Sequence, residues 1–452
     1  MLEYGADESW GPKINGSMYR AYWSWYPGKE FGQLTPMVAQ PNNVKDFFQT
    51  GLNLNNSVAF TSGGEGHNFR LTYGNQQRTL VIPNANRDQH QIALNGSFDV
   101  GKKMTISTDV TYTTFYTKGA PAEGYDLSGL NITQNFNQWF QRQLDMDRMK
   151  QYREADGSLN SWNIGDPNAT SDFSSYGVPQ YWDNPYFVVA ENYTTQKQNR
   201  LVGNIGFNYK FNNHLSLQSN ARMNSYYNEN DGRMATGSLT LPYYRQAQNQ
   251  YKEMNYEANL IYKNKFGAFS VDGLAGGNIR RNSYSQMSLA TEGGLSSPNY
   301  FDIAASVSRP SYSRGYEKKI VNSFYGKASV GYKDFIFVDA TLRNDWSSAL
   351  PTANNSYLYP SVSSSFIFTE FLKTSWLTYG KLRASYASVG SDLGAHSLDL
   401  AINNGSFYGS NASVSIGNQF KGGGIRPALT KAYEFGVELK LFKKIGLDAT
   451  VY

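Results

Sequence analysis

Apolar and polar positions alternate through four consecutive segments between residues 322 and 390. In the second of these segments, Val338 and Leu342 alternate with the charged residues Asp339 and Arg343. Successive side chains of a β-strand point to opposite faces, so a period of two indicates strands with one apolar face and one wet face. The pattern therefore predicts four strands in a row.

The same alternation begins near Leu54 and recurs to the end of the chain, which predicts about 14 strands. Short turns and longer loops connect them: residues 333–334 are expected to form a short turn, and residues 118–195 and about 284–318 long loops. Within the first long loop, four apolar residues recur at spacings of three and four, which predicts one short helix. These residues are Phe136, Trp139, Phe140 and Leu144.

The alternation of seven short turns with six longer loops is typical of a transmembrane β-barrel, whose periplasmic turns are short and whose outer loops are long. Strands of about ten residues with one apolar face match tilted membrane-spanning strands. Aromatic residues near strand ends, such as Tyr209, Tyr262 and Tyr332, suit the interfacial girdle of such a barrel. We therefore predict an all-β fold, an antiparallel transmembrane β-barrel. The alternative is a soluble β-solenoid or sandwich array, in which loop lengths would not alternate.

The composition indicates an ordered protein with a large amphipathic surface. The 452 residues include 34 Tyr, and aromatic residues make up 15% of the chain, whereas disordered chains are poor in them. A net charge of +5 without a long Lys/Arg block argues against binding to nucleic acid. The absence of cysteine excludes disulfides and thiol chemistry. No run of about 18 apolar residues predicts a spanning helix, and residues 1–30 show no signal-peptide pattern.

Three groups of short motifs resemble the SusC/RagA-like, TonB-dependent outer-membrane transporters. The first group is DESWGPK at 7–13 with NVKDFFQTG at 43–51. The second is QWFQR at 138–142, DGS at 156–158, SWN at 161–163 and NPY at 184–186. The third is LRNDWSS at 342–348, YPS at 359–361 and GKLRASY at 380–386. The third group is the most specific, because its three motifs occur in order at plausible spacing.

The resemblance implies both a fold and an activity. Members of this family are similar to one another in having a barrel of about 22 strands, an N-terminal plug inside it, and a TonB-contacting segment ahead of the plug. A SusD-like surface lipoprotein caps the barrel. Together they import oligosaccharides, glycans or peptides with energy supplied through the TonB–ExbB–ExbD complex. In this chain we expect a partial barrel that lacks the plug and the TonB-contacting segment and is unable to transport alone.

On this interpretation, residues 1–452 are all part of one receptor β-barrel domain. Residues 1–53 form an irregular region after the plug, and residues 54–117 carry strands one to four. Residues 118–195 form a long extracellular loop with its helix, and residues 196–452 carry strands five to fourteen. We expect the protein in the outer membrane of a Gram-negative bacterium, in contact with membrane lipid and lipopolysaccharide.

Two groups of residues are candidates for contact with the substrate. Large, rigid tryptophan rings in loops suit stacking on sugars and lean weakly towards a glycan over a peptide, although packing within the loops is the alternative. The candidate substrate-binding residues are Trp10, Trp23, Trp25, Trp162, Trp182, Arg343, Asp345 and Trp346. The expected lumen-facing residues are Arg222, Asp339, Arg343 and Arg383, for which a generic hydrated face is the alternative.

The sequence contains no recognisable set of catalytic residues. The four histidines are scattered, and no Gly-x-Ser-x-Gly motif with catalytic partners is present. Calcium-type oxygen ligands are present in Asp166, Asn168 and Asp172, but these residues lack the full spacing of a calcium loop. We therefore expect no cofactor or metal. Two hypotheses follow: TonB-dependent import of glycans or peptides, and a passive or adhesive barrel whose loops bind without energy coupling.

Overall fold

A computed structural model describes residues 3–124, 130–372, 374–400, 402–405, 408–418, 421 and 423–452 of the chain. Its main feature is one antiparallel sheet of 14 strands. These strands are β3 (Leu52–Gly64), β4 (His67–Thr79), β5 (Asn86–Val100), β6 (Met104–Lys118), β7 (Thr194–Lys210), β8 (Leu215–Met234), β9 (Tyr243–Phe266), β10 (Phe269–Leu295), β11 (Ser306–Tyr332), β12 (Ile336–Ser347), β13 (Ser356–Ile367), β14 (Leu377–Ser391), β17 (Ala428–Leu441) and β18 (Ile445–Val451).

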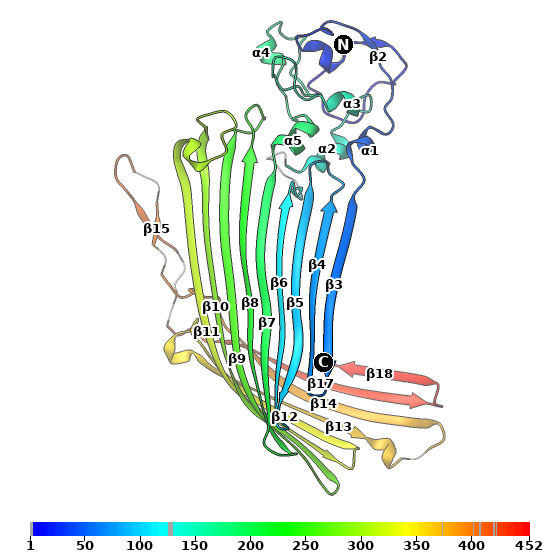
Figure 1. Ribbon diagram of the computed structural model, residues 1–452, viewed down its shortest axis with the longest axis vertical. Helices are drawn as coiled ribbons and strands as arrows, with labels where there is room; N and C mark the ends of the chain where they lie inside the picture. The colour runs from blue at the N-terminus through cyan, green and yellow to red at the C-terminus, as the bar shows by residue number, and fades with distance from the viewer. Residues whose placement is uncertain are drawn as a thin grey trace.

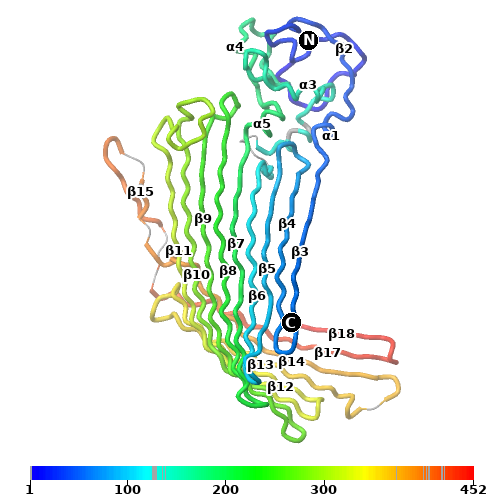
Figure 2. Tube along the Cα trace, viewed as in Figure 1, coloured from blue at the N-terminus to red at the C-terminus, as the bar shows by residue number. Residues whose placement is uncertain are grey.

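Each strand pairs with the next one along the chain, except that β14 pairs with β17. Between these two, β15 (Ile402–Asn404) and β16 (Val414–Ile416) form a separate hairpin. The sheet is strongly curved (Figures 1 and 2), with β3 and β18 at the two ends of its strand order. In the described part of the chain these two strands do not pair with each other. The predicted all-β, partial antiparallel barrel is confirmed.

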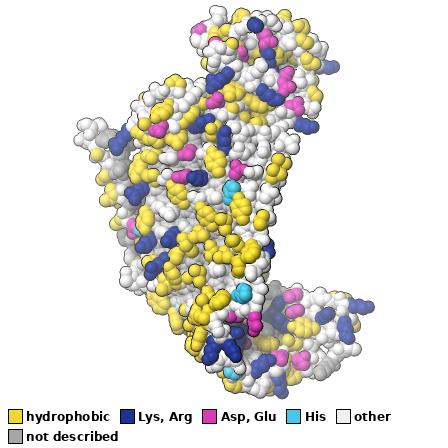
Figure 3. Space-filling view, in the orientation of Figure 1, with side chains coloured by type: hydrophobic (Ala, Val, Ile, Leu, Met, Phe, Trp, Pro, Cys, Tyr) yellow, Lys and Arg dark blue, Asp and Glu magenta, His cyan; other side chains and the backbone are white. Residues whose placement is uncertain are grey.

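The alternation in the sequence gives the sheet two different faces. On β12, Val338 and Leu342 are exposed on one face, while Arg343 lies on the other and pairs in register with Tyr359 of β13. The same apolar face carries Phe60, which is 61% exposed. Figure 3 shows hydrophobic side chains gathered in a band across the strands in this view. An apolar face this exposed requires an apolar surrounding or partner. None of the helices in the described ranges is long and apolar enough to cross a membrane.

Short turns lie at one end of the sheet and longer connections at the other. In the turn between β11 and β12, Lys333 and Asp334 have φ of 48° and 60°, and Phe335 N–H donates to Tyr332 O at 3.1 Å. Positive φ at both central residues is the type I′ geometry that matches the twist of paired strands. The turn between β17 and β18 repeats it at Phe442 and Lys443. The predicted turn at residues 333–334 is therefore confirmed.

The prediction of a long loop over residues 284–318 is wrong. Both β10 and β11 are 27 residues long, and they pair continuously here, with Tyr284 opposite Glu317 and Ser288 opposite Ser313. Polar residues dominate both faces in this part of the hairpin, so the alternation that predicts a strand disappears although the backbone pairing continues.

Residues 3–50 and 130–193 fold together above the ends of β3 to β6 (Figure 1), and we call this unit the loop body. Its regular elements are all short. They are β1 (Met18–Tyr19), β2 (Thr35–Pro36), η1 (Tyr22–Trp25), η2 (Ile132–Gln134), α1 (Asn43–Phe47), α2 (Asn135–Gln138), α3 (Met146–Met149), α4 (Phe173–Tyr176) and α5 (Pro185–Glu191). The remaining helical turns, η3 (Ile303–Ala305), η4 (Thr352–Asn354) and η5 (Phe368–Glu370), lie in connections of the sheet.

The main hydrophobic core lies in the loop body. Phe140 is fully buried and meets Phe136 edge to face at 5.0 Å and Trp162 at 5.4 Å. Leu144 is buried in the same core. The single helix predicted through these residues is wrong in extent, because α2 ends at Gln138. The spacing of apolar residues identified side chains that enter one core, but turns rather than one long helix bring them there.

Polar contacts fasten the loop body to the sheet. Asn84 Nδ2 donates to Val189 O at 2.7 Å, and Ala235 N–H donates to Asn192 Oδ1 at 2.7 Å. Asp183 accepts hydrogen bonds from Ser238 Oγ and from the backbone N–H of Leu239. Burial raises the pKa of the Asp183 carboxyl, and these hydrogen bonds lower the pKa in part. The loop body is therefore held to the sheet by these hydrogen bonds as well as by its chain connections.

We predict that Phe140→Ala loosens the loop body. Truncation of a fully buried aromatic ring costs about 3–5 kcal/mol, and hydrogen exchange measured by mass spectrometry is expected to speed up across residues 130–193. Trp10, which is 93% exposed, is the matched control, and Trp10→Ala is expected to leave exchange unchanged. Equal exchange in the two variants would contradict the position of the core.

Candidate functional site

Arg343 of β12 is the centre of a hydrogen-bonded group on the polar face, the Arg343 cluster (Arg343, Asp345, Tyr359 and Ser323). Its Nε donates to Asp345 Oδ1 at 2.9 Å and to Tyr359 Oη at 2.8 Å, and its Nη2 donates to Ser323 Oγ at 2.8 Å. Tyr359 donates its hydroxyl to Asp345. Asp345 is only 6% exposed, so its charge is compensated by charge-assisted hydrogen bonds inside the cluster.

Polar contacts continue from this cluster to β8. The Arg343 guanidinium lies 5.1 Å from the centre of the Tyr325 ring, and Tyr325 Oη donates to Asn259 Oδ1 at 2.8 Å. Asn259 donates to Glu257, which forms an ion pair with Arg222. One connected network therefore crosses the polar face from β8 to β13.

The network passes over β10 because that strand has a glycine at the crossing point. Gly276 stands between Asn259 of β9 and Tyr325 of β11 in the register. A Cβ at this position would collide with Asn259 Oδ1 and lie 2.9 Å from both the Ala258 carbonyl oxygen and Tyr325 Cε2. The missing side chain is thus what allows the hydrogen bond between Asn259 and Tyr325 to form across an intervening strand.

A second ion pair lies nearer the long connections. Lys319 Nζ donates to Asp392 Oδ1 at 2.7 Å and to Leu393 O at 2.7 Å. The side chains of Lys319 and Asp392 are only 15% and 14% exposed. Ser347 also donates to Asp392. This pair holds the start of the connection after β14 against β11 and β12.

A third polar group lies nearer the short turns. Arg383 Nη2 donates to Asp448 Oδ1 at 2.6 Å and to Thr450 Oγ1 at 3.2 Å. Lys327 Nζ lies 3.6 Å from Asp339 Oδ1. A cleft of about 380 Å³ is lined by Asp339, Arg383 and Thr450 among others. The polar face therefore carries paired charges and hydroxyl groups from the end with the long connections to the end with the short turns.

The paired charges and hydroxyl groups of this face can form hydrogen bonds with a polar molecule. The charged groups named above are held in ion pairs or hydrogen bonds with neighbours, which leaves no activated nucleophile and base pair among them. Within the described ranges, no group of three or more His, Cys, Asp or Glu side chains is placed to hold a metal ion. Asp166 accepts from the backbone N–H of Asn168, and Asp172 caps α4.

The sequence of this sheet matches a known protein family. A family model described as TonB dependent receptor-like, beta-barrel, matches residues 144–452. The chain belongs to the TonB-dependent receptor family. The family resemblance found in the sequence is thereby confirmed, and this is a family of receptors and transporters rather than of enzymes. A search of curated protein sequences finds no match.

Solved RagAB structures have a fold similar to that of this chain. The RagAB peptide importer in its closed-closed state has a TM-score of 0.69 and 15% identity, covering 90% of this chain and 45% of that one. A second RagAB peptide transporter structure has a TM-score of 0.69 and 14% identity, with the same coverage. The open-open state has a TM-score of 0.68, 15% identity and coverages of 90% and 44%. This chain therefore spans less than half the length of each of these RagAB chains.

The structure places the predicted lumen-facing residues of the receptor together. Arg222, Asp339, Arg343 and Arg383 all lie on the polar face, as their strand registers show. Asp345, a candidate substrate-binding residue like Arg343, forms an ion pair with it. Trp346 does not, because it lies one position further along β12, on the apolar face, where it is 42% exposed.

The five candidate tryptophans all lie in the loop body but in different surroundings. Trp10 is 93% exposed, whereas Trp162 is 2% exposed and packs in the core. Trp23, Trp25 and Trp182 are half-buried and pack against that core. Arg20 stacks on Trp25, with its Cζ 3.4 Å from the ring centre, and Trp182 Nε1 donates to Asp7 Oδ2 at 2.7 Å. Packing therefore accounts for most of these rings, and only Trp10 presents its ring freely.

Sequence reasoning missed several members of the network. Tyr359, Asn259, Tyr325 and Lys319 are not among the candidate site residues, although each lies at a polar-face position of its strand. The available signal was the period of two, which places Tyr359 on the same face as Ser361 and Ser363. The cross-strand partners could be found only from the register.

We predict that Gly276→Ala breaks the hydrogen bond between Tyr325 and Asn259. Overpacking of this kind costs about 1–3 kcal/mol, which urea unfolding followed by tryptophan fluorescence in detergent micelles measures. Gly273→Ala on the same strand is the control, because its Cβ would meet nothing nearer than Tyr262 Cβ at 4.0 Å. A Gly276→Ala variant as stable as Gly273→Ala would show that the network does not need the open position.

Proposed function

We propose that this receptor chain acts in TonB-dependent import across the outer membrane of a Gram-negative bacterium, with its apolar face in lipid and its polar face towards the transport path. The observation that carries the proposal is the match to the receptor family combined with the two-faced sheet. Lipid requires an apolar exterior, and a hydrated path requires the paired charges found on the other face.

Aromatic residues support the membrane position. Near the short turns, Phe269 contacts Tyr332 at 4.9 Å, Tyr332 contacts Phe335 at 5.5 Å, and Phe335 contacts Phe371 at 4.8 Å. Tyr209 and Phe211 form a similar pair at 5.0 Å. Aromatic rings of this kind concentrate at the boundary between lipid and water. The short turns would then face the periplasm, and the loop body, at the other end, would face outside.

Import also needs an energy source and a capture partner. We propose that the chain works with a SusD-like surface lipoprotein and is driven by the TonB–ExbB–ExbD complex. Support comes from the likeness in fold to the RagAB importers. Contacts with lipopolysaccharide are proposed for the outer end of the apolar face. The cargo is proposed to be an oligosaccharide or glycan, with a peptide as the alternative that the RagAB structures suggest.

We predict that cells expressing the gene for this protein take up fluorescently labelled oligosaccharides only while the inner-membrane proton gradient is maintained. A protonophore is expected to abolish uptake, because energy reaches the barrel through TonB. A labelled tripeptide, measured in parallel, distinguishes the two cargo classes. Uptake that persists unchanged without the gradient would instead identify a passive barrel, and surface binding without any uptake in energised cells would identify an adhesive one.

We also predict that a charge on the proposed lipid face is costly. Val362 is 45% exposed on the apolar face, and Val362→Arg is expected to lower the free energy of unfolding in phospholipid vesicles by about 2–4 kcal/mol. The neighbouring Ser363→Arg is the control, since it points to the polar face opposite Asp339. Equal stabilities for the two variants in urea titrations would contradict the assignment of faces.

A further inference from the structure

Three basic residues lie together on the face of the sheet that carries the exposed apolar side chains. They are Lys252 of β9, Arg281 of β10 and Lys318 of β11, and all three are exposed. Ser283 pairs in register with both lysines, and Arg281 is two positions from Ser283 on the same strand, so the three side chains share one face. From the spacing of strands and residues in a sheet, their Cα atoms lie within about 10 Å of one another. We call these residues the basic trio.

The basic trio has no negative partner in the described part of the chain. No ion pair or side-chain hydrogen bond joins any of the three to another described residue. Glu253 and Glu317 are neighbours in sequence, but the period of two turns both carboxylates to the polar face, where Glu253 accepts a hydrogen bond from Asn282. Three cations without a counter-charge repel one another, and a bound anion would remove that repulsion.

The basic trio marks the end of the apolar part of this face. On β10, the positions that share this face from Phe269 to Ile279 carry no charge, and Arg281 is the next such position. Lys252 and Lys318 are likewise the first charged residues on this face of β9 and β11, counted from the short turns. A tilted strand crosses the hydrocarbon core in about 9–11 residues. With the short turns in the periplasm, as proposed above, the basic trio lies at the headgroup level of the outer leaflet.

An apolar groove lies on the same face, next to the basic trio on the side of the short turns. Its volume is about 770 Å³. Two of its lining residues, Ala258 and Gly277, pair in register and fill little space, whereas Ile279 and Trp346 are larger lining residues. Ile279 is two positions from Arg281 on β10. A chain of CH₂ groups lying in the groove would therefore end beside the basic trio.

We propose that the basic trio and this groove bind one molecule of lipopolysaccharide, with a phosphate of its lipid A on the three cations and an acyl chain in the groove. The proposal rests on the membrane position proposed above and names the residues that make the lipopolysaccharide contact. Arg281 offers a planar fork for two phosphate oxygens, and the two lysines add point charges beside it. Basic clusters at this depth of a membrane protein recognise lipid headgroups.

The number of cations favours lipopolysaccharide over a phospholipid. The phosphodiester of a phospholipid such as phosphatidylglycerol carries one negative charge, which a single cation balances. A phosphate monoester, the form found in lipid A, carries about −1.5 to −2 near neutral pH, so it matches three unpaired cations better. A free phosphate ion would leave the groove beside the basic trio unused, whereas an acylated phosphate uses both features.

The test is microscale thermophoresis of the purified, fluorescently labelled protein in an uncharged detergent. The probes are lipid A, lipid A after enzymatic removal of its phosphates, phosphatidylglycerol and inorganic phosphate. Lipid A is expected to bind with a Kd at least tenfold lower than that of each other probe. Combining Lys252→Gln, Arg281→Gln and Lys318→Gln is expected to raise the Kd for lipid A at least tenfold, because the charge-assisted contacts to the phosphate are lost.

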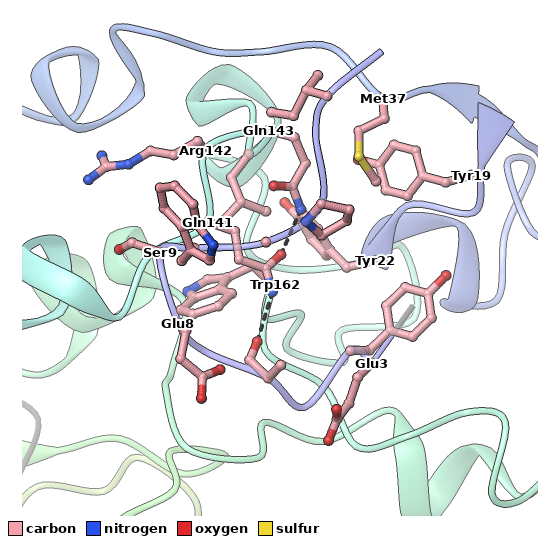
Figure 4. Close-up of a pocket in the computed structure, with 17 residues that line it drawn as sticks. Glu3, Glu8, Ser9, Tyr19, Tyr22, Met37, Gln141, Arg142, Gln143 and Trp162 are labelled. Carbon is pink, nitrogen blue, oxygen red and sulfur yellow. Dashed lines mark hydrogen bonds between the residues drawn. The ribbon is translucent and has the colours of Figure 1, made fainter. Parts of the chain in front are cut away.

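Arg142→Gln is the matched control for the loss of charge. This exposed arginine belongs to the loop body, where it lines a cavity of about 420 Å³ and its guanidinium points away from Trp162 (Figure 4). Its Kd for lipid A is expected to match the wild type.

A second variant tests the groove while keeping the basic trio. Ala258→Phe fills the groove and is expected to raise the Kd for lipid A about tenfold. Ala340→Phe is its control, because Ala340 lies on the apolar face opposite Val362 and does not line the groove. Circular dichroism checks that each variant keeps its strand content.

Four results would overturn the proposal. Two concern the phosphate: equal binding of dephosphorylated lipid A, or unchanged binding in the triple variant. The third is unchanged binding in Ala258→Phe, and the fourth is tighter binding of phosphatidylglycerol, which would assign the site to a phospholipid. The import proposal has a different readout, uptake by energised cells, so it stands even if the purified protein does not bind lipid A.

Discussion

The register of one continuous antiparallel ladder is the constraint on which this structure depends. Fourteen strands share their backbone hydrogen bonds in chain order, and each strand has a side-chain period of two. A slip of one residue between any two strands would exchange the faces. Leu342 would then leave the apolar face, and Arg343 would leave its partners on the neighbouring strands. Turns such as the one at Lys333 and Asp334, with positive φ at both residues, limit such slips by setting the strand pairing directly.

Correct register also explains how a polar face can be stable beside an apolar one. Arg343, Asp345 and Tyr359 come from adjacent strands and satisfy one another. The open position at Gly276 lets the same network cross a strand that contributes no side chain to it. A face built in this way offers many hydrogen-bonding groups without a large unpaired charge, which suits the passage of a polar molecule.

The loop body is stabilised differently from the sheet. The sheet has little interior of its own, since its apolar side chains point outwards, whereas the loop body has a packed aromatic core around Phe140 and Trp162. Buried asparagines replace regular backbone pairing there. Asn163, for example, donates to Gly5 O and accepts from Tyr181 N–H. Such a core gives the loop body a defined shape at the end of the sheet that carries the longer connections.

The sequence by itself determined the strand number, the faces and the position of the longest loop, because a period of two is a local property of the chain. It also named Arg343 and Asp345 as candidate site residues, although not as partners of each other. It did not reveal that β10 continues to Leu295 and that β11 begins at Ser306, because strands that are polar on both faces lack the signal. Nor did it reveal α5, although Asn184 and Pro185 are a standard helix start.

Only the tertiary structure decided which residues meet. Asn259 and Tyr325 are 66 positions apart, and their contact depends on two registers and on one glycine between them. Trp162 is a sequence-based candidate for direct stacking on a sugar, yet the fold buries its ring in the core of the loop body. Local alternation specifies the face that a side chain takes, whereas its partner depends on long-range pairing that no single stretch of sequence contains.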